Sequence, residues 1–144
     1  MFENADRNEL RQVYFQIWHK HLQQAPLEPL EQQILQIMLQ HPEYFGIFND
    51  PDHYLEHDYP QQSGSSSPFL HLSLHQALVE QLTTHRPAGI QAIYKQLAQH
   101  FGSHEAEHKM MEVLMQTLRQ GLQQGQMLTE TEYLQRLRTL LIFS

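Results

Sequence analysis

Apolar residues recur at helical spacing along most of this chain. In the N-terminal segment, one stripe follows the i, i+3, i+4, i+7 rule: Leu10, Val13, Tyr14, Ile17, Trp18 and Leu22. This stripe predicts a helix from about Asp6 to Gln23, ended by Ala25-Pro26. A second stripe predicts a helix that begins near Pro29 and stops at Pro42, with one further turn after it.

The C-terminal half shows the same spacing with clearer end signals. Ser67 and Pro68 are typical of an N-cap and the first helical position. The helix that they begin, over residues 68–84, is apolar on most sides, which is typical of a buried central element. A shorter helix ends at Gly102, and Ser103 is predicted to cap the next, which runs to about Gly121 or Gly125. Thr129 is predicted to cap the last helix.

Residues 49–67 differ from the rest, because they are rich in Pro, Asp, Ser and Gly. We expect an irregular loop there that links helices or covers a site. No segment alternates between apolar and polar residues as a strand does. The patterns predict one all-α domain over residues 1–144, a bundle of about six helices without a sheet. Its 68–84 helix is expected to pack against the 103–121 helix.

Composition narrows the function classes. The formal charge of −7, with His neutral, would repel a nucleic-acid backbone, so we expect no nucleic-acid partner. Cysteine is absent, which excludes disulfides, thiolate metal sites and a cysteine nucleophile. The N-terminus lacks the features of a signal peptide, and no apolar run is long enough to span a membrane. These features predict a cytoplasmic location without membrane attachment.

Histidine is the unusual residue, with 11 in 144 positions. His71 and His75 are four residues apart in the apolar helix, and His104 and His108 are four apart in a later one. Residues four apart share a helix face, so two such helices packed together can present four imidazoles to a metal. Glu112, one turn after His108, is the nearest carboxylate candidate. The sequence therefore predicts a divalent-metal site, for zinc, iron or manganese, between the two helices.

His104, Glu105 and His108 also spell H-E-x-x-H, the helical zinc motif of metalloproteases. That chemistry needs a third ligand, and "HKMMEVLMQT" supplies neither the Gly nor the third His of the extended motif. Glu105 also lies in the first turn of its helix, where the helix dipole favours an acidic residue without any catalytic role. We therefore rank an H-E-x-x-H zinc hydrolase below the metal site between two helices.

A different class of function remains open. A composition with 11 His produces i, i+4 pairs by chance, and four occur here: 53/57, 71/75, 100/104 and 104/108. Buried histidines also serve as ordinary hydrogen-bonded core residues. The alternative is a regulatory or scaffold module with structural histidines and no metal, whose partner is another protein or a second copy of the chain.

Several blocks of the sequence resemble a known family: "HPEYFGIFND", "SPFLHLSLHQALVEQL", "RPAGIQAIYKQL" and "HEAEHKMMEVL". The chain resembles the DUF1841 family of small proteobacterial proteins of unknown function along nearly its whole length. The resemblance carries His71, His75, His104 and His108 with Glu112, but Glu105 lies outside the family pattern. "HPEYF" departs from a version with a second His. The resemblance implies a bacterial, cytoplasmic, helical protein and implies no activity.

Overall fold

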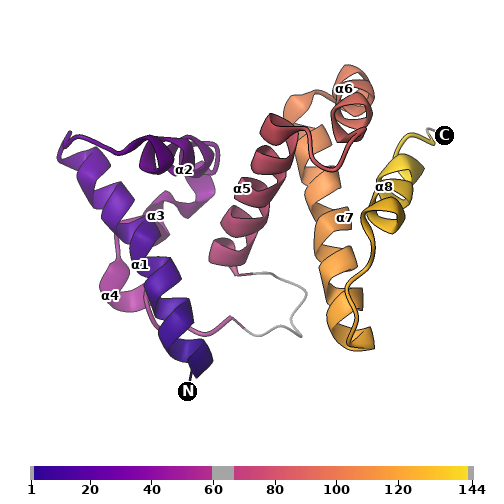
Figure 1. The fold of residues 1–144 in the computed structure, drawn as a ribbon. Coiled ribbons are helices and arrows are strands. Elements are labelled where there is room, and N and C mark those ends of the chain that lie inside the picture. The colour runs from indigo at the N-terminus through magenta and orange to yellow at the C-terminus, as the bar shows by residue number, and fades with distance from the viewer. Residues whose placement is uncertain (1, 60–66, 143–144) are drawn as a thin grey trace. The chain divides into compact units, whose positions relative to one another are not determined.

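A computed structural model describes residues 2–59 and 67–142 (Figure 1). Side chains are described from Arg7 onward. Within these ranges the chain forms eight α-helices and one 3-10 helix, and no strand. The predicted all-α class is confirmed, and six of the helices correspond to the six expected. The expected loop at 49–67 contains a short helix, and its residues 60–66 lie outside the described ranges.

The chain divides into two compact units, residues 1–72 and 73–144. The N-terminal unit contains α1 (Phe2–Leu22), α2 (Pro29–Leu39), η1 (Pro42–Tyr44), α3 (Phe45–Phe48), α4 (Pro51–Tyr54) and the start of α5 (Pro68–Thr84). Its buried residues include Tyr14, Ile17 and Met38. The indole Nε1–H of Trp18 donates to the Oδ1 of Asn49 at 2.7 Å, so this buried ring keeps a polar partner.

Arg11 ties α1 to the chain that follows α4. Its guanidinium Nη1 lies 3.2, 3.0 and 2.7 Å from the carbonyl oxygens of Tyr54, Leu55 and His57. The residue is 4% exposed, and its guanidinium lies over the Phe69 ring, 4.8 Å from the centroid. Arg11 therefore provides a buried donor for carbonyl oxygens at the end of α4 and in the chain that follows it.

The C-terminal unit contains the rest of α5, α6 (Ile90–Phe101), α7 (Ser103–Gln124) and α8 (Glu130–Thr139). One apolar core joins them, with contributions from all four helices: Leu74, Leu78, Leu82, Ile90, Ile93, Leu97, Ala106, Met110, Met111, Leu114, Tyr133 and Leu137. Side chains of α5 and α7 share this core, so the expected packing of the 68–84 helix with the 103–121 helix is confirmed.

Two of the three predicted helix caps are present in the structure, and the third prediction is wrong. The Ser67 hydroxyl oxygen accepts from the Phe69 N–H at 3.1 Å, and the Thr129 hydroxyl oxygen accepts from the Glu132 N–H at 3.2 Å. Ser103 is the first residue of α7 rather than its cap. Gly102, with φ +87°, both ends α6 and precedes α7, so no further residue separates the two helices.

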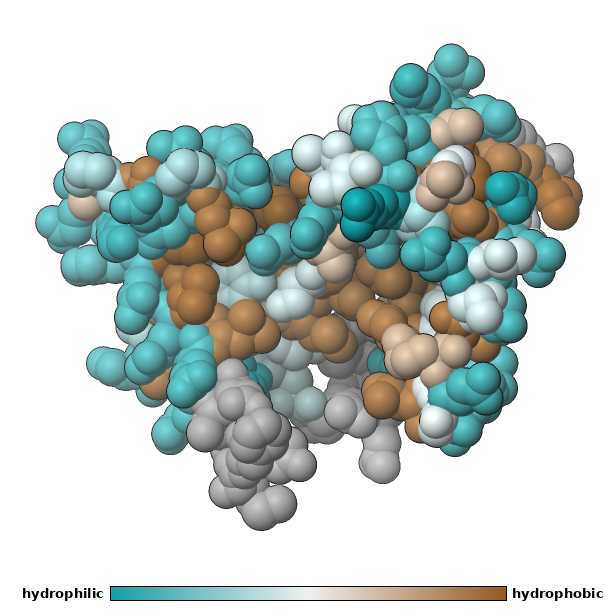
Figure 2. Space-filling view, viewed as in Figure 1, coloured by the Kyte–Doolittle hydropathy of each residue, from teal (hydrophilic) through white to brown (hydrophobic). Residues whose placement is uncertain are grey.

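Both units present some hydrophobic side chains to solvent, seen as brown among teal in Figure 2. The large exposed ones are Leu10, Val13, Leu22, Leu30, Leu39 and Leu70 in the N-terminal unit, and Leu122, Met127 and Ile142 in the C-terminal unit. Among the described helices, none combines the length and apolar character needed to cross a lipid bilayer.

Candidate metal site

The site in the C-terminal unit is built around His75, which is completely buried in α5. Its Nε2 lies 3.4 Å from the Oε2 of Glu107 on α7. The Glu107 side chain is 17% exposed, so its carboxylate reaches the edge of the core with limited access to water. A buried imidazole and a mostly buried carboxylate therefore face each other across the α5–α7 packing.

His108 completes the cluster from the next position of α7. Its ring centroid lies 5.3 Å from that of His75, in an edge-on arrangement. Its Nδ1 lies 2.8 Å from the backbone carbonyl oxygen of His104, one turn earlier. A carbonyl oxygen only accepts hydrogen bonds, so Nδ1 carries the proton and donates it. The neutral ring then has its lone pair on Nε2.

The surroundings of His108 favour its uncharged form. Burial lowers the pKa of His108 below the usual value of 6.5, and the neighbouring imidazoles of His104 and His75 lower it further. The hydrogen bond to the His104 carbonyl and the charge of Glu107 act in the opposite direction but are smaller in sum. His108 is therefore a neutral ring near pH 7, which is the form that a metal ion binds.

Glu107 also influences α6. Burial, and next the negative charge of Glu107, raise the pKa of the Tyr94 phenol. Tyr94 is therefore a polar residue of α6 that senses the charge of Glu107. The cluster receives a polar neighbour from a third helix, although the imidazole and carboxylate groups come from α5 and α7.

Of the five residues predicted from the sequence, His75 and His108 lie together. His104 is exposed, and its ring packs against that of His108 with centroids 4.2 Å apart. Glu112 is exposed on α7. His71 lies one turn before His75 on α5 and belongs to the N-terminal unit, where its ring contacts that of His41.

The H-E-x-x-H motif does not take the form that a protease needs. The Glu105 side chain is 57% exposed, and its nearest charged partner is Lys109, one turn later at 4.0 Å. A general base must reach a metal-bound water, whereas this carboxylate pairs with a surface ammonium. His104 lies in the first turn of α7 and is exposed.

Two residues of interest were not singled out as ligands by the sequence pattern. Glu107 lies within the H-E-x-x-H stretch at the start of a helix. The helix dipole favours an acidic residue there, so Glu107 needs no role as a ligand to explain it. Its position three residues before the buried Met110 was the available signal, because residues three apart share a helix face. His41, at the end of α2, has no spacing partner in the sequence, so only its contact with His71 identifies it.

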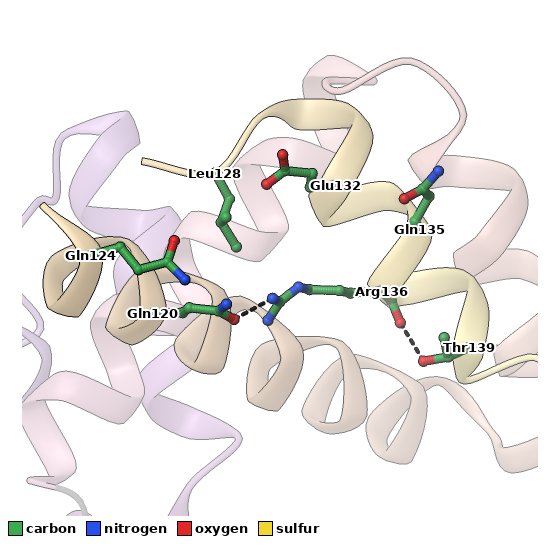
Figure 3. Close-up of a pocket in the computed structure, with 7 residues that line it drawn as sticks. All are labelled: Gln120, Gln124, Leu128, Glu132, Gln135, Arg136 and Thr139. Carbon is green, nitrogen blue, oxygen red and sulfur yellow. Dashed lines mark hydrogen bonds between the residues drawn. The ribbon is translucent and has the colours of Figure 1, made fainter. Parts of the chain in front are cut away.

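A separate open groove lies between α7 and α8 (Figure 3). Its lining is mainly polar: Gln120, Gln124, Leu128, Glu132, Gln135, Arg136 and Thr139. The Arg136 guanidinium donates to the Oε1 of Gln120, and the Thr139 hydroxyl donates to the Arg136 carbonyl at 2.6 Å. The Arg136–Gln120 bond joins α8 to α7, and the lining of the groove includes no histidine.

The molecule is thus an all-α protein in which a histidine and carboxylate cluster lies between two packed helices. The family described as "Domain of unknown function (DUF1841)" matches residues 6–139, so the chain belongs to this family. No curated protein matches the chain. No solved structure matches it either.

Proposed function

We propose that this protein binds a divalent transition-metal ion through His75, His108 and Glu107 in its C-terminal unit. The observation that carries the proposal is the 3.4 Å separation between His75 Nε2 and Glu107 Oε2, beside the His108 ring. The proposal keeps His75 and His108 from the sequence analysis and takes Glu107 as the carboxylate. Glu112 is exposed one turn beyond His108 and is not needed for a three-ligand site.

The distances suit ligands of one ion. Two ligand atoms that each lie about 2.1 Å from a tetrahedral zinc ion are about 3.4 Å apart. The His75 and Glu107 atoms are separated by 3.4 Å. Two imidazoles that bind one such ion have ring centroids about 5 Å apart by the same geometry. The His75 and His108 centroids are 5.3 Å apart, which is close to that separation.

The protonation of His108 supports the same proposal. Metal-binding histidines usually donate their second N–H to a carbonyl or carboxylate, which fixes the ring and its tautomer. His108 has this arrangement through the His104 carbonyl. Its lowered pKa means that an ion does not have to displace a proton at neutral pH.

The ligand set narrows the choice of ion. Two imidazoles and one carboxylate occur in zinc hydrolases, where the fourth position holds water, and in non-haem iron oxygenases. Zinc, iron and manganese therefore remain the candidates. Three protein ligands leave a position for water or a substrate, so the site has the composition of a reactive centre as well as of a structural one. The family resemblance supports a bacterial, cytoplasmic setting for this proposal.

The test uses the untagged protein, stripped with a chelator and titrated with Zn²⁺ in a calorimeter. Wild type should bind zinc, and His75→Gln and His108→Gln should each weaken the affinity by at least about 10-fold, because each removes a direct ligand. His100→Gln, at an exposed histidine of the same unit, is the matched control and should bind like wild type. Circular dichroism verifies that each variant remains helical.

The structural alternative predicts a different set of results. If the histidines only form a hydrogen-bonded core network, untagged wild type carries no metal, and zinc changes neither its stability nor its spectra. In that case the His75–Glu107 contact is an internal polar pair, and the metal proposal is wrong. Equal zinc affinity in wild type and both variants would also contradict it, because the ion would then be bound elsewhere.

A further inference from the structure

The N-terminal unit contains a second pair of histidines, His41 and His71. Their ring centroids lie 4.8 Å apart with the planes nearly perpendicular, and one potential ligand nitrogen of each lies within 4.8 Å of the other. His41 is 3% exposed, and His71 is half-buried. Each imidazole ring has two polar nitrogens, which need hydrogen-bond partners or a bound ion where they are buried.

Rigid neighbours hold both rings. His41 lies between α2 and η1, where the following Pro42 disfavours the helical backbone conformation, and its φ is −123° and its ψ 69°. Its ring stacks on Tyr44, with centroids 5.3 Å apart and planes at 20°. His71 lies in the first turn of α5, and its ring meets Tyr44 edge-on at 6.0 Å. The two imidazoles are therefore positioned by helix ends and by one shared aromatic ring.

A carboxylate lies on the Nδ1 side of His41. The Oε1 of Glu43 is 3.5 Å from that nitrogen. A carboxylate in this position favours the proton on Nδ1 and leaves the lone pair on Nε2, as in the carboxylate–histidine pairs behind many metal ligands. His108 in the C-terminal unit has the same feature, with the His104 carbonyl as the acceptor. Each unit thus supplies a histidine whose Nδ1 faces an oxygen acceptor and whose ring contacts a histidine of α5.

We propose that His41 and His71 are metal ligands in the N-terminal unit, with Glu43 as the positioning residue for His41. This proposal rests on the proposed metal-binding function, because it takes the kind of ion from it. That ion is a divalent transition metal that accepts imidazole nitrogen. The proposal adds His41 to the ligands predicted from the sequence and gives the "HPEYF" segment a chemical role. Two nitrogens about 2.1 Å from one ion are at most about 4.2 Å apart. Small rotations of the rings therefore allow both to bind.

The absence of cysteine from the chain allows a direct test. His41→Cys places a single thiol at the proposed ligand position, and cobalt(II) is the probe. A thiolate bound to cobalt gives an intense near-ultraviolet charge-transfer band that imidazole ligands do not give. We expect this band in His41→Cys under reducing conditions. His19→Cys, at an exposed histidine on α1, should not give it.

His71→Cys is the reciprocal variant and should give the same band. Circular dichroism shows whether each variant keeps the helical content of wild type, and either folded variant is sufficient for the test. A folded variant at position 41 or 71 that binds cobalt without the band, or that resembles His19→Cys, overturns the proposal.

The readout also separates this proposal from the proposed function. If His108→Gln weakens zinc binding while the cysteine variants show no band, only the N-terminal ligands are wrong. If the band appears while His75→Gln and His108→Gln bind zinc like wild type, the N-terminal pair is a metal site and the C-terminal cluster is not. If no metal binds to any variant or to wild type, both are wrong.

Discussion

The Nδ1–H of His108 donates to the backbone carbonyl oxygen of His104 at 2.8 Å, across one turn of α7. The acceptor is a main-chain atom, so the bond depends on the helix and not on the side chain at position 104. The bond directs the lone pair of the neutral His108 ring to Nε2, and it fixes the tautomer before any ion is present.

This relationship predicts a single His108 tautomer. In metal-free protein at pH 7.5, long-range ¹⁵N–¹H correlation spectra should show the proton on Nδ1 of His108, assigned by its loss in His108→Gln. His104→Ala should leave that tautomer unchanged, because it retains the carbonyl acceptor. Exposed His19, as the control, should show the mixture typical of solvated imidazole. A proton on Nε2 of His108 would contradict the arrangement that we describe.

The lowered pKa of His108 predicts that metal-free protein loses stability in mild acid. Burial is the largest cause of the lowered pKa of His108, and the imidazoles of His104 and His75 lower it further. The charge of Glu107 acts in the opposite direction. Below an unfolded pKa of about 6.5, the unfolded state binds a proton that the folded state resists. The free energy of unfolding should therefore fall as pH drops from 7.5 to 5.5, as measured by urea denaturation with chelator present. His108→Gln should have a flatter profile, and an unchanged slope would show that other groups cause the loss.

Tyr133 predicts a loss of stability in the alkaline range. Burial raises its pKa to about 12, and its O–H donates to the Gln81 side-chain oxygen at 2.8 Å. Above an unfolded pKa of about 10, the unfolded state loses a proton that the folded state retains. The stabilisation is complete below pH about 10 and should decline by about 2–3 kcal/mol as pH rises towards 12. Tyr133→Phe should flatten this limb in urea denaturation; an equally steep limb would mean that Tyr133 ionises freely in the folded protein.

Arg11 should matter much more to stability than Arg7, although both are arginines of α1. Arg11→Met leaves three carbonyl oxygens without their buried donor, so we expect a loss of about 2–4 kcal/mol in urea denaturation. Arg7 pairs with Asp58, whose side chain is 85% exposed, so Arg7→Met should cost less than about 1 kcal/mol. Similar losses for the two variants would contradict the role that we assign to Arg11.

Much of the fold could be predicted, because the residues that begin and end its helices act on their near neighbours in the chain. Ser67-Pro68 and Thr129 mark helix starts through hydrogen bonds within three residues, so sequence is sufficient to place them. The loop at 49–67 was less predictable. Its "NDPDHY" segment contains α4, and the Asp50 side chain caps that helix by accepting from the His53 N–H at 3.3 Å. Pro and Asp are also common in turns, so the sequence did not distinguish a short helix from a loop.

The candidate site was harder to predict than the helices. Spacing placed His75 and His108 on inward stripes, and the structure brings their rings together. Spacing favoured Glu112, four residues after His108, and did not single out Glu107. In the structure, the Glu107 carboxylate lies 3.4 Å from His75, whereas Glu112 is exposed. The carboxylate beside His75 is therefore Glu107.

The central claim concerns the atoms around the ion, so X-ray absorption at the zinc edge tests it most directly. Untagged protein loaded with equimolar zinc and desalted should give a first shell of nitrogen and oxygen at about 2.0–2.2 Å, with the multiple-scattering signature of imidazole. That signature should weaken in His75→Gln and His108→Gln. Zinc that is lost on desalting, or a shell of oxygen without imidazole scattering in wild type, would contradict a metal site built on His75, His108 and Glu107.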